Sequence, residues 1–191
     1  MSFFSSFPLL VPLLVLTVFN LFIIYAKQAG RDGADQLQSI TLLVLCLAII
    51  IDKEGAFQAA LFFISFQLLL AYSTSGIAKL LGSEWRKGRV VSKILSTESH
   101  GSKKASYFLN KYILADKMAS YMPILLFSTL PMTFFFGTQE LLILHLSCIF
   151  MFHLGCALLM GLNNFLFAFP FCYPAIIYSQ NYKQFWVLLN K

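Results

Sequence analysis

Long uninterrupted apolar runs restrict what this sequence can fold into. A membrane-spanning α-helix needs roughly 20 mostly apolar residues. Six segments approach or exceed that length, at residues 3–26, 36–51, 56–79, 118–136, 141–162 and 165–178. None of them alternates apolar and polar residues as the strands of a membrane barrel do. The sequence therefore predicts an all-α, polytopic membrane helical bundle with about five to six transmembrane helices.

The composition supports this prediction, because 59% of the residues are apolar and only 12% are charged. Soluble domains average about 45–50% apolar and about 25% charged residues. Residues 36–51 are short for a span, and residues 165–178 contain Pro170 and Pro174, so these two spans are the least well defined. No long polar segment interrupts the chain, and we expect a single transmembrane domain over residues 1–191.

Positive charge is concentrated in one connector, residues 80–117. It carries Arg86, Lys87, Arg89, Lys93, Lys103, Lys104, Lys111 and Lys117, against Glu84, Glu98 and Asp116. Its apolar residues, Trp85, Val90, Val91, Ile94 and Leu95, recur among the basic ones at near-helical spacing. This pattern predicts an interfacial amphipathic helix that contacts membrane lipids. An ordinary basic cytoplasmic loop explains the same charges and is compatible with that helix, whereas nucleic-acid binding is not expected.

The four cysteines lie inside apolar runs and show no CxxC spacing. We expect Cys46, Cys148, Cys156 and Cys172 to be small buried apolar side chains rather than disulfide partners, and we predict no metal site.

Lys79 is the polar side chain with the most informative surroundings. Tyr72, Gly76 and Lys79 are spaced i, i+4, i+7 and share one helix face, on which Gly76 leaves room for another molecule. One interpretation is a lysine that snorkels to the headgroups. In the other, the amine is removed from water, is more easily deprotonated, and acts as a general base or nucleophile.

His153 lies in the middle of an apolar run, "IFMFHLGCALLMGL". It is interpreted either as a structural histidine or as a group that orients a substrate or relays a proton. Ala157 and Gly161 are spaced as a small-xxx-small face, which favours close helix packing.

Residues 72–88, "YSTSGIAKLLGSEWRKG", match a specific membrane-protein signature. They resemble the Tyr-x-x-(small)-Gly-x-x-Lys-Leu-x-x-x-x-Trp-x-x-Gly motif of the horizontally transferred transmembrane (HTTM) family, which is related to vitamin K-dependent gamma-glutamyl carboxylase. Residues 32–52 resemble the family's Gly-x-Asp segment. Residues 152–165 resemble its histidine-containing helix, above all in sporulation-delaying-protein B-type members, which assist maturation of a secreted peptide toxin.

The resemblance implies a function and a set of site residues. Lys79 would be the catalytic base that deprotonates a quinol of the vitamin K or menaquinol type, and His153 the intramembrane histidine. Tyr72, Gly76 and Trp85 would line the cofactor pocket. The protein would assist modification or maturation of a peptide or protein partner in a bacterial inner (cytoplasmic) membrane.

Two departures from the family pattern leave a second hypothesis open. Only about 30 residues precede the Gly-x-Asp segment, and "LLFSTLP" (125–131) lacks the acidic residue that the family commonly has there. The alternative is a non-catalytic subunit of a larger membrane complex that binds lipid, quinone or neighbouring helices.

Overall fold

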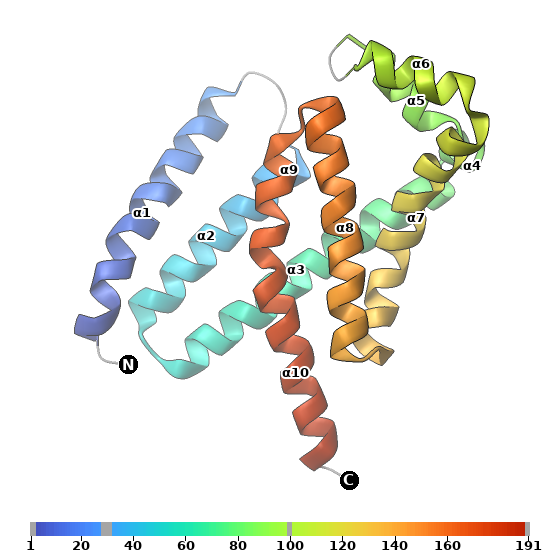
Figure 1. Ribbon diagram of the computed structural model, residues 1–191. Coiled ribbons are helices and arrows are strands. Elements are labelled where there is room, and N and C mark those ends of the chain that lie inside the picture. Colours follow the sequence, from blue (N-terminus) through green and yellow to red (C-terminus); the bar gives the residue numbers. More distant parts are fainter. Residues whose placement is uncertain (1–2, 28–31, 99–100, 190–191) are drawn as a thin grey trace. The chain divides into compact units, whose positions relative to one another are not determined.

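The computed structural model describes residues 3–27, 32–98 and 101–189 (Figure 1), and the side chains of 8–27, 32–53, 55–98 and 101–182. All regular secondary structure in these residues is helical. The chain divides into two compact units. The first unit comprises Met1–Leu68 with Ala168–Lys191, and the second comprises Leu69–Phe167.

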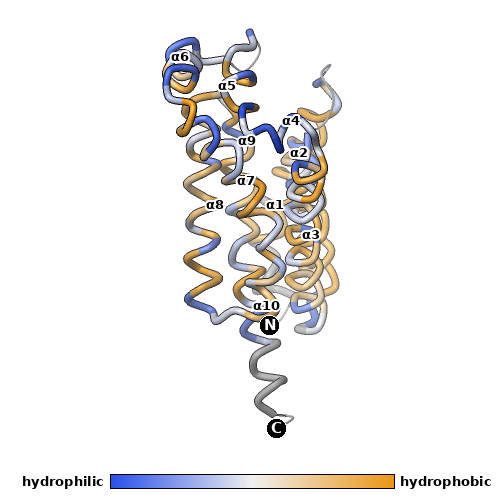
Figure 2. The backbone as a smooth tube through the Cα atoms, turned by 90° about the vertical axis from the view of Figure 1, so that its right-hand side faces the viewer, coloured by the Kyte–Doolittle hydropathy of each residue, from blue (hydrophilic) through white to orange (hydrophobic). Residues whose placement is uncertain are grey.

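Five helices of the described part are long and apolar enough to cross a membrane. They are α1 (Phe3–Ala26), α2 (Gly33–Ile51), α3 (Glu54–Leu81), α7 (Ile113–Phe136) and α8 (Gln139–Met160). Hydrophobic residues dominate along these helices in Figure 2. The predicted all-α membrane bundle is therefore confirmed at the level of helix number and composition.

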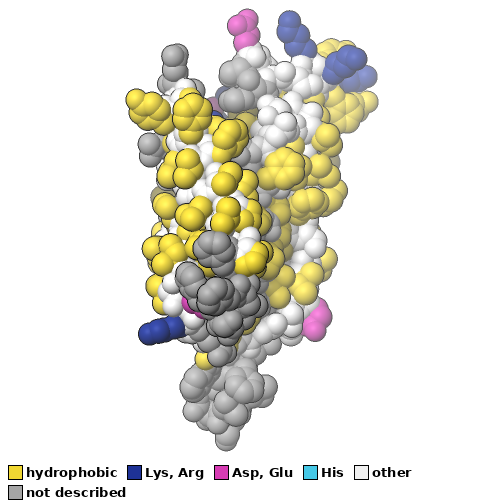
Figure 3. Space-filling view, turned by 90° about the vertical axis from the view of Figure 1, so that its left-hand side faces the viewer, with side chains coloured by type: hydrophobic (Ala, Val, Ile, Leu, Met, Phe, Trp, Pro, Cys, Tyr) yellow, Lys and Arg dark blue, Asp and Glu magenta, His cyan; other side chains and the backbone are white. Residues whose placement is uncertain are grey.

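In the first unit, α1 and α2 lie side by side (Figure 1) and share polar contacts. Ser39 donates a hydrogen bond to Asn20 Oδ1 at 2.8 Å, which satisfies a buried amide oxygen. Asp32 caps α2 by accepting from the Asp35 N–H, so this helix begins three residues earlier than predicted. Hydrophobic side chains cover the outward surface of α1 in Figure 3, among them Leu9, Val15, Val18, Phe19 and Phe22. This surface is suited to lipid contact.

The sixth segment, residues 165–178, is not a single spanning helix as predicted. It is divided among α9 (Asn163–Ala168), the 3-10 helix η1 (Pro170–Cys172) and α10 (Tyr173–Leu189). Proline has no N–H and cannot continue a helical hydrogen-bond ladder from within it, but the first turn of a new helix tolerates it. Pro170 accordingly begins η1, and Pro174 lies in the first turn of α10.

In the second unit, α7 and α8 are neighbours along the chain and pack on each other. His145 of α8 joins them, because its Nε2 lies 2.9 Å from the carbonyl oxygen of Leu126 on α7. A carbonyl can only accept, so Nε2 donates, and Nδ1 of the neutral ring accepts from the Thr133 hydroxyl at 2.8 Å. These two bonds lie on either side of Pro131, where α7 loses a ladder hydrogen bond.

The amphipathic connector differs in detail from the predicted helix. It forms three short helices, α4 (Ser83–Arg86), α5 (Val90–Leu95) and α6 (Lys103–Lys111). Gly88 interrupts the first two with a φ of +68°. Val90 and Leu95, which we expected to face lipid, are buried, because α5 packs on α6 and α7. The exposed aromatic residues lie instead on α6.

Gly76 lies where the backbones of α3 and α7 approach closely. A Cβ at this position would lie 2.6 Å from the Ser128 backbone nitrogen and 2.9 Å from the Phe127 carbonyl carbon. The interpretation that Gly76 leaves room for another molecule is therefore wrong, since the backbone of α7 fills that space.

Gly161 also has a different role from the predicted one. It caps the C-terminus of α8 with a φ of +70°, and no described atom other than those of its chain neighbours lies within 4 Å of where its Cβ would be. It terminates the helix and does not form a packing face with Ala157.

We expect Gly76→Ala to lower the free energy of unfolding by about 1–3 kcal/mol, because two backbones must move apart to admit one methyl group. Gly155→Ala in α8 is the matched control, since no described atom beyond its chain neighbours and its own helix backbone lies within 4 Å of where its Cβ would be. Unfolding in mixed micelles measures both variants. Equal stability of the two would contradict the close packing at Gly76.

Candidate functional site

Two of the predicted site residues meet directly inside the second unit. The Tyr72 hydroxyl of α3 lies 2.9 Å from His153 Nε2 of α8. Both side chains are buried, with exposed fractions of 1% and 3%. A hydrogen bond in such surroundings is costly to remove, because each partner would lose its bond away from water.

Aromatic rings enclose this pair. The Phe127 ring of α7 lies 5.0 Å from the Tyr72 ring and 6.2 Å from the His153 ring, measured between centroids. Phe152 and Phe165 lie 5.6 and 6.1 Å from His153. The Tyr72–His153 pair is therefore surrounded by rings contributed by α7, α8 and α9.

Lys79 lies on the same face of α3, and its ammonium contacts rings rather than a carboxylate. Its Nζ donates to the Ser75 hydroxyl at 2.5 Å, and it lies 5.3 and 5.2 Å from the ring centroids of Trp85 and Phe127. No ion pair within the described part of the chain involves Lys79. Ser75 is one helical turn closer to the middle of the span. The ammonium is thus directed back along α3, whereas snorkelling would carry it towards the headgroups.

Phe127 is the residue that the sequence did not single out. Its ring contacts Lys79, Tyr72 and His153, and only 4% of the side chain is exposed. Among 21 phenylalanines, no spacing or motif distinguishes it. The one available signal is Pro131, four residues later, because proline removes the N–H that would bond to the Phe127 carbonyl.

Trp85 is held beside Lys79 by contacts between the connector and α7. The Tyr121 hydroxyl of α7 donates to the Arg86 carbonyl oxygen at 2.6 Å. A Cβ at Gly88 would lie 2.9 Å from the Tyr121 ring, so the chain must pass close to this side chain. The positions of Trp85 and Gly88 therefore both depend on contacts with Tyr121 in the first half of α7.

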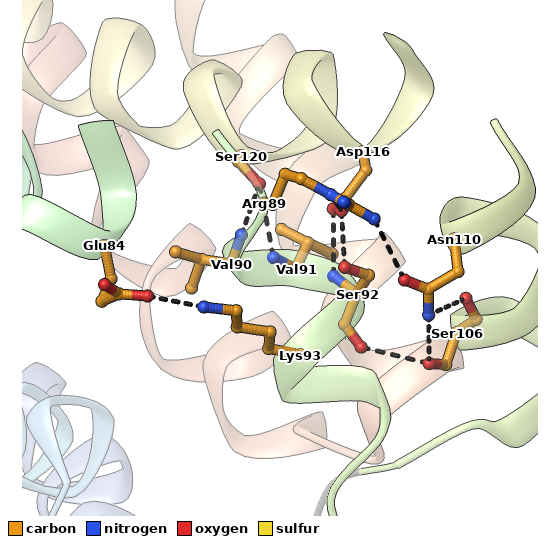
Figure 4. Close-up of polar contacts among 10 residues, drawn as sticks. All are labelled: Glu84, Arg89, Val90, Val91, Ser92, Lys93, Ser106, Asn110, Asp116 and Ser120. Atoms are coloured by element: carbon orange, nitrogen blue, oxygen red, sulfur yellow. Dashed lines mark hydrogen bonds and ion pairs between the residues drawn. The ribbon is translucent and has the colours of Figure 1, made fainter. Parts of the chain in front are cut away.

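Asp116 and Ser120, one turn apart on α7, fasten the start of α5 (Figure 4). The Ser120 hydroxyl oxygen accepts from the N–H groups of Val90 and Val91 at 3.2 and 3.3 Å. Asp116 accepts from the N–H and the hydroxyl of Ser92 at 3.0 and 2.5 Å. The first N–H groups of a helix have no partner within the helix. Here α7 supplies the acceptors that the Arg89 side chain does not.

The same network extends to α6 (Figure 4). Arg89 lies 3.7 Å from Asp116 and 3.3 Å from the Asn110 side-chain oxygen. Ser106 donates to the Ser92 carbonyl oxygen at 3.1 Å. The buried carboxylate of Asp116 therefore ties the start of α5 to α7, and α6 is tied to α5 through Ser92 and Arg89.

The cysteines are free thiols with unequal exposure. Cys46 and Cys172 are buried as expected, whereas Cys148 is exposed and Cys156 is partly exposed. The prediction of four buried residues is wrong for Cys148, because an outward face of an apolar helix also accommodates a thiol. The described residues contain no group of three or more His, Cys, Asp or Glu side chains that could hold a metal ion.

The quinol implied by the resemblance does not fit between Tyr72 and His153. These side chains bond directly to each other and are almost fully buried. Lys79 and Trp85 are only partly buried. A flat lipophilic molecule could therefore reach the ammonium only through the exposed part of these two side chains. The structure thus brings Tyr72, His153 and Lys79 around Phe127, while Gly76 packs on α7 and Trp85 covers Lys79.

Comparison of the chain with protein-family models, with curated proteins and with solved structures finds no match.

We expect Asp116→Ala to release α5 from α7, because two buried donors of Ser92 lose their acceptor. Leaving one buried donor without an acceptor lowers the free energy of unfolding by about 1–3 kcal/mol. Hydrogen–deuterium exchange of residues 90–96 measures the release. Glu98→Ala is the control, since it removes an exposed acid from the same connector. Unchanged exchange in the Asp116→Ala protein would show that the carboxylate does not anchor α5.

Proposed function

We propose that this chain is an HTTM-type, carboxylase-like protein of a bacterial inner membrane that assists modification or maturation of a peptide or protein partner. Lys79 is its reactive group in this proposal. One observation carries it: the ammonium is held by Ser75 and two rings, with no carboxylate to fix it as a structural cation within the described residues.

A lysine in such surroundings can serve as a base. The amine is a proton acceptor once it is neutral, and a lysine in that form can act as a general base. The serine hydroxyl orients the nitrogen, and the rings of Trp85 and Phe127 shield it from water. The substrate proton would be transferred to Nζ from the partly exposed side.

His153 acts through other residues in this proposal. Its bond to Tyr72 and its contact with Phe127 fix the ring against which Lys79 rests. It is therefore a positioning residue, and the proton relay considered from the sequence is not needed.

The second candidate is a non-catalytic subunit of a larger membrane complex. The observation that favours it is the filled space around the predicted pocket. Tyr72 bonds directly to His153, and α7 occupies the space beside Gly76. In that case Lys79 would be a structural cation bound by two aromatic rings, and its positive charge alone would be required for its role.

Substitutions of Lys79 distinguish the two candidates. If Lys79 is a base, Lys79→Ala and Lys79→Arg both reduce partner modification by about 100-fold or more, because a guanidinium retains the charge but cannot be deprotonated in a protein. Mass spectrometry of peptides secreted by cells with and without the protein measures the modification. Lys53→Ala, at an exposed loop lysine, is the matched control.

If the Lys79→Arg protein modifies the partner as fully as the wild type does, Lys79 is not a base. The second candidate, a non-catalytic subunit that needs only a positive charge at this position, would then hold. Wild-type modification by Lys79→Ala at an equal membrane level would remove both roles for this residue.

A further inference from the structure

We propose that the outward face of α6 binds the anionic headgroups of membrane lipids. This face, called here the basic-aromatic face, consists of Lys103, Lys104, Tyr107, Phe108 and Lys111. It is distinct from the Lys79 site, and the proposal does not depend on the function proposed above.

The residues of this face lie in two adjacent rows on the helix. Lys103, Tyr107 and Lys111 are four residues apart, and Lys104 and Phe108 form the neighbouring row. The opposite side of α6 faces the protein, where Ser106 is buried and bonds to Ser92. Tyr107 and Phe108 are exposed, by 73% and 54%. Lysines and aromatic rings thus alternate on one free surface.

The lysines of this face make no ion pair within the described residues, whereas other basic residues of the connector do. Lys87 and Lys93 bond to Glu84 at 2.5 and 2.6 Å, and Arg89 pairs with Asp116. The bonds from Lys87 and Lys93 lower the pKa of Glu84 to about 2, so its carboxylate remains charged in the physiological range. No ion pair among the described residues involves Lys103, Lys104 or Lys111.

Chain connectivity holds this face at the membrane surface. The span of α3 ends at Leu81 and that of α7 begins at Ile113. A single residue, Tyr112, is both the C-cap of α6 and the N-cap of α7. Figure 2 shows the hydrophilic residues of α6 next to the end of the hydrophobic α7. The face therefore cannot leave the headgroup region while α7 spans the bilayer.

The chemistry of the face fits an anionic bilayer surface better than a soluble acidic partner. Exposed tyrosine and phenylalanine are suited to the boundary between headgroups and acyl chains. Lysines beside them attract anionic headgroups within a Debye length. A site for an acidic protein would not need apolar rings held at this depth.

Electron paramagnetic resonance of the full chain in phosphatidylcholine bilayers tests the proposal. The probes are spin-labelled phosphatidylglycerol and spin-labelled phosphatidylcholine. We expect the wild type to prefer the anionic probe, and this preference to fall by roughly fivefold for each lysine removed in Lys103→Gln/Lys104→Gln/Lys111→Gln. These side chains are exposed, so the variant should keep its fold, which circular dichroism checks.

Two further variants act as controls. Lys103→Arg/Lys104→Arg/Lys111→Arg should retain the preference, because charge and not ammonium shape is required. Glu84→Gln/Lys87→Gln should also retain it, because this variant removes one negative and one positive charge and leaves the net charge of the connector unchanged. Excess glycerol phosphate should not abolish it, since the free anion lacks the bilayer in which the rings insert.

Three results would overturn the proposal: equal affinity of the wild type for both probes, an unchanged preference in the glutamine variant, or complete competition by glycerol phosphate. Binding of a polyglutamate peptide at this face, without any lipid preference, would assign the face to an acidic protein instead.

Discussion

The close approach of α3 to α7 at Gly76 is the contact on which the candidate site depends. It brings the backbone of Phe127 and Ser128 against α3, where any side chain at position 76 would collide with them. The Phe127 ring can then contact Lys79 one turn further along α3 and Tyr72 one turn back. Tyr72 in turn bonds to His153 of α8. One glycine thus lets three helices converge on a single ring, and the signature glycine serves helix packing where we had expected a ligand.

A second constraint is the need to satisfy backbone groups where the chain leaves the membrane. The connector must begin a short helix next to an apolar span, and Arg89 provides no side-chain cap. Asp116 and Ser120 provide the acceptors from α7. Asp116 thus fixes the start of α5 on α7, and Ser106 of α6 bonds to Ser92 of α5. Separately, the Tyr121 hydroxyl of α7 bonds to the Arg86 carbonyl oxygen next to Trp85.

The sequence was sufficient for the features that depend on periodicity and composition. Five of the six predicted spans, their helical type and the shared face of Tyr72, Gly76 and Lys79 follow from composition and spacing. Features that depend on tertiary contacts could not be obtained in this way. The spacing of Val90 and Leu95 predicts a lipid-facing surface, but α7 covers both residues. Phe127 cannot be distinguished by sequence from the other phenylalanines. No spacing or motif singles out His145 either, although both of its nitrogens bond to α7 around Pro131. In each case the partner is distant in sequence and has no motif.

In this structure the Lys79 ammonium lies against the rings of Trp85 and Phe127, whereas a snorkelling lysine would bind lipid phosphate. Solid-state NMR of the protein in bilayers, with ¹⁵N-labelled lysine and ¹³C-labelled phenylalanine rings, measures this directly. We expect a dipolar contact between Lys79 Nζ and the Phe127 ring, whose centroid lies 5.2 Å away, and its loss in Phe127→Leu. Strong dephasing of the Lys79 nitrogen by lipid ³¹P, without the ring contact, would show a snorkelling lysine and would contradict the account.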